Sequence, residues 1–161
     1  MRTYAGTAAL PSALAPAGWP GQPGQHESGL SLWTTQRGDG TILDVTTILV
    51  VDDHTPFRIQ ARALLEAAGF VVVGEAVDGA SGLAAAKALR PDLVLLDVGL
   101  PDIDGFQVAC ELADRDPDLP VILVSTREAA DYGPRLACSR AIGFIAKDEL
   151  SGPAILALME R

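Results

Sequence analysis

The stretch DLVLLDVGLPDIDGF, residues 92–106, decides the fold of this chain. Its first part, LVLLD at 93–97, is a short and nearly continuous apolar run, which is typical of a parallel strand buried on both faces. Asp97 closes the run, a turn with glycine and proline follows, and a helix is expected from about Gly105 to Ala113. A buried strand, a short turn and a helix in this order form the repeating unit of a parallel α/β sheet.

The same alternation of strand and helix signals continues on both sides of this stretch. Four further apolar runs predict strands: ILVVD at 48–52, FVVVG at 70–74, VILVS at 121–125 and IGFIA at 142–146. The other helices are predicted between the N-cap candidate Thr55 and Gly69, at 78–89, at about 128–137 and at 149–160. Because Gly133 and Pro134 interrupt the helix at 128–137, we expect it to be short or distorted. Five strands alternating with helices predict a doubly wound parallel sheet with helices on both faces.

The N-terminal segment, residues 1–46, differs from the folded domain expected at 47–161. It is rich in glycine, proline and small polar residues, and its apolar residues follow neither a helical nor a strand period. Such a segment buries too little apolar surface to offset the entropy lost on ordering, so we expect a disordered tail. A misassigned start codon is compatible with this reading. The alternative is a short partner-binding motif around Leu30, Leu32 and Trp33.

Composition and charge exclude several classes of function. The net charge of −9 would repel a phosphate backbone, so direct binding of DNA is not expected. The longest apolar runs are far too short to span a bilayer. Cys110 and Cys138 lack CxxC spacing and form no zinc pattern with His26 and His54. Two thiols in an acidic chain favour a reducing, cytoplasmic location.

Polar residues stand at the carboxyl ends of four of the expected strands. These strand-end residues are Asp52 and Asp53, then Asp97, then Ser125 and Thr126, and finally Lys147. In a doubly wound sheet, ligands bind beyond the carboxyl ends of the strands. A core has no need for three carboxylates, a hydroxyl and an ammonium group at one edge, so this pattern predicts a functional site there.

The chemistry of these groups suits phosphoryl transfer. Neighbouring carboxylates repel one another, which raises their pKa values unless a cation compensates. Mg²⁺ is the expected cation, because it prefers a few carboxylates together with phosphate oxygens. Asp97 could then attack a phosphorus atom, as carboxylates do in covalent phosphoryl transfer. Lys147 would neutralise charge on the transferred oxygens, and Ser125 could donate a hydrogen bond to them.

Each of these residues also has an ordinary structural alternative. Asp52 and Asp53 could cap the following helix, and Asp97 could be a turn residue before Gly99. Ser125 could cap a turn, and Lys147 could be a plain surface charge. The remaining aspartates of the loops and helix ends are interpreted as solvated charge: Asp102, Asp104, Asp114, Asp116 and Asp118.

Taken together, four motifs resemble the receiver domain of bacterial response regulators in two-component signalling. They are ILVVDDHTPFR, DLVLLDVGLPDIDGF, VILVSTRE and GFIAKDEL, which occur in this order within residues 47–161. The resemblance implies a flavodoxin-like α/β fold whose five parallel strands lie in the order 2-1-3-4-5. It implies Asp97 as the phosphoacceptor, with Lys147 and Ser125 assisting the transfer. The protein would then be a switch that catalyses only its own phosphorylation and dephosphorylation, and no enzyme otherwise.

The resemblance also implies a magnesium site and a switching pair. Asp53 and Asp97 would bind Mg²⁺ directly, the Gly99 carbonyl would complete the protein ligands, and Asp52 would act through water. Ser125 and Phe144 would be the switch residues, although Phe144 could equally be a core residue. They would alter a protein-interaction face made by the fourth strand, the helix after it and the fifth strand.

The expected partners are a sensor histidine kinase or phosphotransfer protein and a downstream protein. Asp148 stands where many receivers have proline, and the KDEL stretch resembles receivers that precede a helix-turn-helix output. The residues after Lys147 suffice for one helix only, so we expect a stand-alone receiver, with a fragment of a longer regulator as the alternative.

Two other functions compete with this interpretation. One is a receiver-like interaction module that is never phosphorylated, against which the intact Asp53, Asp97 and Lys147 argue. The other is a phosphohydrolase with an aspartate nucleophile, which needs a second aspartate where Gly99 stands.

Overall fold

The computed structural model describes residues 34–36 and 42–160 of the chain. The chain divides into two units, residues 1–45 and residues 46–161. In the first unit, the short strands β1 (Thr34–Gln36) and β2 (Ile42–Asp44) pair in an antiparallel manner. The rest of the expected tail, including the candidate motif around Leu30, Leu32 and Trp33, lies outside the described residues, so its disorder stays a prediction.

The second unit is built on five parallel strands. They are β3 (Thr47–Val51), β4 (Val71–Ala76), β5 (Leu93–Asp97), β6 (Val121–Ser125) and β7 (Gly143–Ala146). Their order in the sheet is β4-β3-β5-β6-β7, and every neighbouring pair is parallel. This confirms the expected order 2-1-3-4-5. The order reverses between β3 and β5, so a ligand site is expected beyond the carboxyl ends of these two strands.

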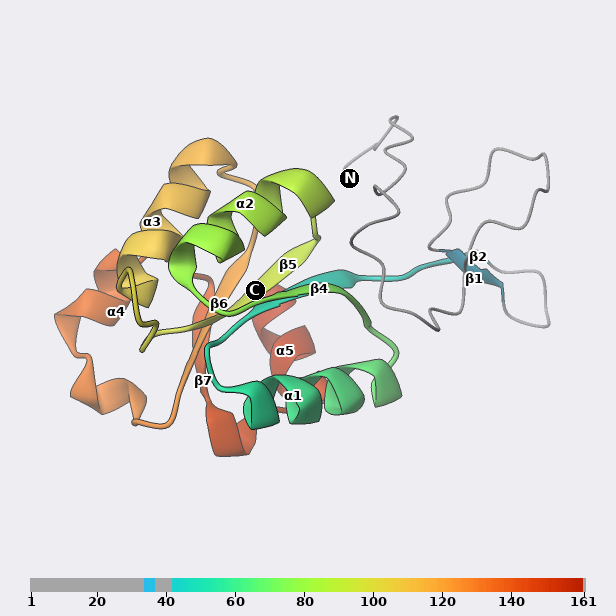
Figure 1. Ribbon diagram of the computed structural model, residues 1–161. Coiled ribbons are helices and arrows are strands. Elements are labelled where there is room, and N and C mark those ends of the chain that lie inside the picture. Colours follow the sequence, from blue (N-terminus) through green and yellow to red (C-terminus); the bar gives the residue numbers. More distant parts are fainter. Residues whose placement is uncertain (1–33, 37–41, 161) are drawn as a thin grey trace. The chain divides into compact units, whose positions relative to one another are not determined.

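Helices cover both faces of this sheet (Figure 1). They are α1 (Thr55–Ala67), α2 (Gly79–Leu89), α3 (Gly105–Arg115), α4 (Pro134–Cys138) and α5 (Gly152–Met159). Helices α1 and α5 pack on one face, and α2 and α3 pack on the other. No helix in the described part of the chain is long and apolar enough to cross a membrane.

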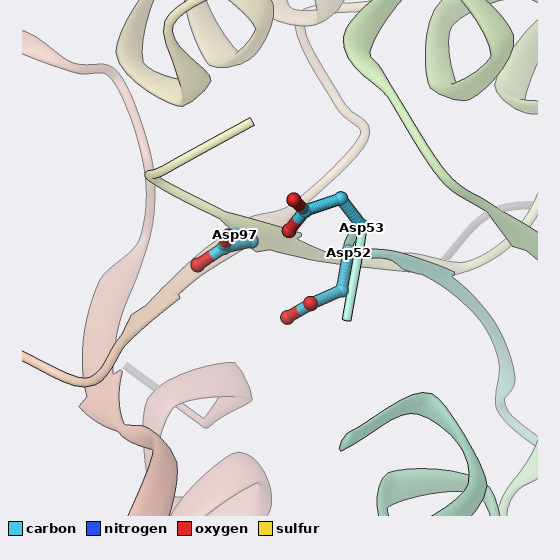
Figure 2. Close-up of side chains that lie close together, drawn as sticks. All are labelled: Asp52, Asp53 and Asp97. Carbon is cyan, nitrogen blue, oxygen red and sulfur yellow. The ribbon is translucent and has the colours of Figure 1, made fainter. Parts of the chain in front are cut away.

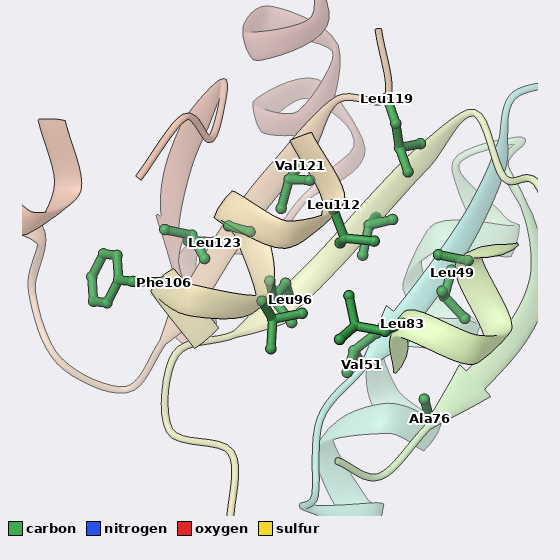
Figure 3. Close-up of a cluster of buried hydrophobic side chains, with 14 of the residues drawn as sticks. Leu49, Val51, Ala76, Leu83, Leu96, Phe106, Leu112, Leu119, Val121 and Leu123 are labelled. Carbon is green, nitrogen blue, oxygen red and sulfur yellow. The ribbon is translucent and has the colours of Figure 1, made fainter. Parts of the chain in front are cut away.

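The two faces of the sheet form two hydrophobic cores. Because successive side chains of a strand point to opposite faces, Leu49 and Val51 join the core under α2 and α3, whereas Ile48 and Val50 join the core under α1 and α5. Figure 3 shows the first of these cores, with Leu83 of α2 packed among the strand residues. Strands β3, β5 and β6 are buried along their whole length, as the continuous apolar runs predicted.

Helix α1 begins one residue earlier than predicted. His54 occupies the N-cap position without a side-chain capping bond, and Thr55 is already helical. The Thr55 hydroxyl instead accepts a hydrogen bond from the Arg58 guanidinium at 3.1 Å. Proline is tolerated anywhere in the first turn, where the missing N–H would have no helical partner, so Pro56 does not mark the first position uniquely. The predicted end is confirmed, because Gly69 follows the helix with φ +92°.

The segment between β6 and β7 is broken, as Gly133 and Pro134 predicted. It consists of the 3₁₀ turn η1 (Ala129–Asp131) and the short helix α4, with Gly133 at φ +47° between them. The last helix is shorter than predicted. Residues 147–149 form the 3₁₀ turn η2 (Lys147–Glu149), and α5 starts only at Gly152, where the Ser151 hydroxyl accepts the Ala154 N–H. A serine cap sets this start, because it satisfies a free backbone donor.

Candidate functional site

The sheet brings the predicted strand-end residues to one edge. Asp52 directly follows β3, Asp97 ends β5, Ser125 ends β6 and Lys147 directly follows β7. The register aligns these ends, since Asp97 pairs with Val124 and Ser125 pairs with Ala146. The polar groups therefore meet because four parallel strands stop at nearly the same level.

Three carboxylates form the centre of this edge. Figure 2 shows Asp52 and Asp53 at the end of β3 and Asp97 at the end of β5. One carboxylate oxygen from each lies within 4.8 Å of the others. Asp52 and Asp97 are buried, with 0% and 5% of their surface exposed, and Asp53 is exposed. Two buried carboxylates beside an exposed one make an acidic cluster that reaches the surface at Asp53.

Lys147 places a positive charge beside this acidic cluster. Its Nζ lies 2.6 Å from Asp52 Oδ2 and 3.2 Å from Asp97 Oδ1, and only 13% of its side chain is exposed. The same Nζ lies 4.5 Å from the centre of the Phe57 ring, a cation–π distance. Lys147 is therefore held in place by two carboxylates and a ring, which excludes the alternative of a plain surface charge. Sequence reasoning missed Phe57, whose helix position alone indicates a core residue.

The environment opposes ionisation of Asp97. Burial raises the pKa of Asp97 above its ordinary value of 3.8, and the negative charge of Asp52 raises this pKa further. Lys147 and the Gly99 N–H lower the pKa, but these effects are smaller than that of burial. A second cation beside the acidic cluster would therefore favour the ionised form of Asp97.

The groups present fit a hard divalent cation. Asp52 Oδ1 accepts the His54 N–H at 2.8 Å, whereas Asp52 Oδ2 has an ion pair with Lys147 but no hydrogen bond among the described residues. A buried carboxylate oxygen with unused acceptor capacity suits a metal-bound water. The Gly99 backbone lies beside Asp97, since a Cβ on Gly99 would be 3.6 Å from Asp97 Oδ2. Oxygen donors of this kind are those that Mg²⁺ prefers.

Arg58 fastens the acidic strand end to α1. Its guanidinium donates to the Asp52 backbone carbonyl at 2.8 Å and to the Glu75 carboxylate at 3.1 Å. The residue is 9% exposed, so these charge-assisted bonds form largely away from solvent. This contact fixes the backbone from which the carboxylates project; Arg58 ends the motif ILVVDDHTPFR, but the sequence analysis gave it no role.

Ser125 and Phe144 are linked through a residue that the sequence did not reveal. The Ser125 hydroxyl lies 2.7 Å from the Tyr132 hydroxyl and accepts the Arg127 N–H at 3.1 Å. The Tyr132 ring lies 5.8 Å from the Phe144 ring and 5.3 Å from the Phe106 ring. Ser125 thus caps a turn, which was its structural alternative. It also lies at the carboxyl edge of the sheet, where the functional site was predicted.

Two of the aspartates that we interpreted as solvated charge have structural roles. The Asp102 carboxylate accepts the N–H groups of Gly79 and Ala80 at 2.7 and 2.9 Å, and these bonds lower the pKa of Asp102. Asp104 caps α3 through the Phe106 N–H at 2.9 Å. Both residues are exposed, as the interpretation held, but the interpretation was incomplete: the Asp102 carboxylate also meets free N–H groups at the start of α2.

The fold and the site together define a class. A five-stranded sheet of order 2-1-3-4-5 with an acidic triad and a buried lysine at its carboxyl edge is the architecture of a signal receiver. The chain belongs to the response regulator receiver domain family, whose sequence model matches residues 48–158.

Relatives and solved structures agree with this assignment. The chain is 38% identical over 101 residues to the response regulator GacA of Pseudomonas viridiflava, a match that covers 62% of this chain and 47% of GacA. It resembles the signal receiver domain of NarL from Mycobacterium tuberculosis, with 34% identity and a TM-score of 0.65 over 73% of this chain and 98% of that one. The fold alone is also shared with the chemotaxis response regulator CheY4 of Vibrio cholerae, at 24% identity and a TM-score of 0.62 over 73% and 98% of the chains. The chain spans about half the length of the curated relatives that it matches.

Proposed function

We propose that the chain is a phosphorylation-activated switch in which Asp97 accepts a phosphoryl group from a phospho-histidine of a sensor kinase or phosphotransfer protein. The observation that supports this most directly is the position of Lys147 between two carboxylates. Lys147 contacts both Asp52 and Asp97 from a largely buried position. A lysine so placed can stay paired with Asp52 while it meets new negative charge at Asp97.

The transfer is a displacement at phosphorus. A carboxylate oxygen of Asp97 forms a bond to the phosphorus, the phosphorus–nitrogen bond to the donor histidine breaks, and the histidine leaves as neutral imidazole after taking up a proton. The product is an acyl phosphate on Asp97. Because the transition state spreads charge over three oxygens, catalysis consists of positioning and charge neutralisation.

The residues around Asp97 divide this work. Asp53, Asp97 and the Gly99 carbonyl would hold Mg²⁺ directly, and Asp52 would hold it through water. Bound Mg²⁺ would supply charge neutralisation for the phosphoryl oxygens. Lys147 would pair with a second phosphoryl oxygen, and the Ser125 hydroxyl would donate to a third. The exposed position of Asp53 leaves the phospho-histidine donor a route to the acidic cluster.

Phosphorylation would act on the surface formed by β6, α4 and β7. Ser125 would turn toward the phosphoryl group, and Phe144 would pack inward beside β6. The shift requires only that the phosphoryl group interact better with one of two arrangements than with the other. Phe144 is half-buried, so it has room to change its packing.

The output of this chain would be a contact with another protein, in the cytoplasm and without DNA. Described residues 46–160 form the receiver. The net charge of −9 opposes association with a phosphate backbone. Some of the curated relatives are described as putative transcription regulators and are about twice the matched length, so regulation of transcription is a property of those longer proteins.

The test is incubation with acetyl phosphate, followed by intact mass measurement. Wild type should gain one phosphoryl group with Mg²⁺ and none with excess EDTA. Asp97→Asn should gain none, whereas the matched control Asp114→Asn, at the exposed end of α3, should behave as wild type. Equal labelling of Asp97→Asn and wild type would contradict Asp97 as the acceptor, and a wild type that gains no phosphoryl group would favour the interaction module that is never phosphorylated.

A further inference from the structure

The Ser125 hydroxyl is already occupied in this structure. A hydroxyl offers one donor and two acceptor positions. The Arg127 N–H uses one acceptor position of Ser125, at 3.1 Å, and the Tyr132 hydroxyl at 2.7 Å uses another position, whichever oxygen donates. Ser125 is 5% exposed, so water competes little for these bonds. A Ser125 side chain that moves toward a phosphoryl group on Asp97 would therefore lengthen its contact with Tyr132 unless the Tyr132 ring moves with it.

The Tyr132 ring cannot simply follow Ser125. It lies between two aromatic rings, with Phe106 at 5.3 Å and an interplanar angle of 62°, and Phe144 at 5.8 Å and 54°. Both arrangements are in the range of favourable aromatic pairs. The Phe106 ring is in turn covered by the Arg135 guanidinium at 4.5 Å, which also pairs with Asp104 at 2.6 Å. The ring is thus anchored in the aromatic layer between α3 and β7.

We propose that Tyr132 is a positioning residue that holds Ser125 away from the phosphoryl site until Asp97 is phosphorylated. The inference rests on the proposed function, since it needs a phosphoryl group that attracts Ser125. The Tyr132 hydroxyl stabilises the resting arrangement, so it sets how much phosphorylation is needed to switch the domain. Loss of the contact also removes one restraint on the Tyr132 side chain beside Phe144, which would carry the change to the surface of β6, α4 and β7.

Removing only the hydroxyl tests the idea, because Tyr132→Phe keeps the ring. The probe is beryllofluoride, a stable phosphoryl mimic, titrated with Mg²⁺ present while the NMR signals of Phe144 are followed. Tyr132→Phe should bind the mimic about fivefold more tightly than wild type, as expected for one neutral hydrogen bond lost from the resting state alone. The matched control is Tyr4→Phe, which removes the other phenol of the chain and should leave the affinity unchanged.

A second pair of proteins shows whether the hydroxyl acts through Ser125. In a Ser125→Ala background, Tyr132→Phe should no longer change the affinity, because its partner is gone in both states. An equal gain in both backgrounds would overturn the inference, as would unchanged or weaker binding by Tyr132→Phe. In wild type, the Tyr132 ring signals should also shift at saturating mimic, and unmoved signals would overturn it independently of any variant.

The outcomes separate this inference from the proposed function. If wild type binds no beryllofluoride, or binds it equally after Asp97→Asn, the phosphoryl site itself is wrong and the inference fails with it. If binding needs Asp97 but ignores Tyr132, the switch stands and only the role of Tyr132 is refuted.

Discussion

Replacing Lys147 with methionine should destabilise the receiver by about 3 kcal/mol at pH 7.5. The change removes the ammonium that lies 2.6 Å from Asp52 Oδ2 and 3.2 Å from Asp97 Oδ1, and it leaves two carboxylates facing each other. Breaking a buried ion pair costs about 3–5 kcal/mol. The lower end applies here, because 13% of the lysine side chain is exposed and the methionine thioether can pack against the Phe57 ring in place of the ammonium.

The pH dependence of this loss has a definite sign. The pKa of Asp97 is already above 3.8 in the folded protein, and Lys147→Met removes one of the influences that lower it. A carboxyl group whose folded pKa exceeds its unfolded value loses its stabilising contribution as the pH rises through the folded pKa. The deficit of the variant should therefore be largest at pH 7.5 and shrink as the pH falls toward 4. Millimolar Mg²⁺ should restore part of the loss at pH 7.5.

Urea unfolding measures both effects. With a slope of about 1.5 kcal/mol per M, the midpoint should fall by about 2 M at pH 7.5. The matched control is Lys87→Met on α2, which makes the same charge change at an exposed position and should cost less than about 0.5 kcal/mol. Equal losses of unfolding free energy for the two variants, or a Lys147→Met loss that does not change with pH, would refute the electrostatic account of the acidic cluster.

Three further outcomes follow from the site and the fold. Gly105→Ala should lower the free energy of unfolding in urea by about 2–3 kcal/mol, because the new Cβ would lie 2.7 Å from the Val98 Cα. Gly99→Ala should lower it by less than about 1 kcal/mol, and equal losses for the two variants would contradict the packing. Asp53→Ala should weaken Mg²⁺ binding at least about tenfold by calorimetry while the fold is unchanged, and an unaltered affinity would move the direct ligand to another carboxylate. Deleting residues 1–45 should shift the thermal midpoint of the receiver by less than about 2 °C, and a larger drop would show that the tail stabilises the domain.

The strands of the central sheet could be predicted closely from the sequence because burial on both faces leaves a continuous apolar run. The runs at 93–97 and 121–125 match β5 and β6 residue for residue. Strand β4 was harder, since the prediction ended it at Gly74. The strand continues to Ala76 because its pairing with β3 extends to that residue. Pairing partners are set by the tertiary fold, which a local pattern does not contain.

Some residues of the site could also be predicted from the sequence, and others could not. The strand-end residues Asp52, Asp97 and Lys147 were predictable, because parallel strands deliver their carboxyl ends to one edge. Phe57 and Tyr132 were not, because their roles depend on contacts between segments that carry no shared motif. The roles assigned to the strand-end residues remain predictions, even though the structure brings the side chains together as expected.

The most direct test of the central claim is the position of the phosphoryl group. The chain is phosphorylated with acetyl phosphate and Mg²⁺, reduced with borohydride, which converts an aspartyl phosphate to homoserine, and mapped by peptide mass spectrometry. The account predicts homoserine at position 97 alone, in proportion to the phosphoryl content of the intact chain. Homoserine at position 52 or 53, or a stable phosphate on Ser125 with Asp97 unchanged, would contradict it.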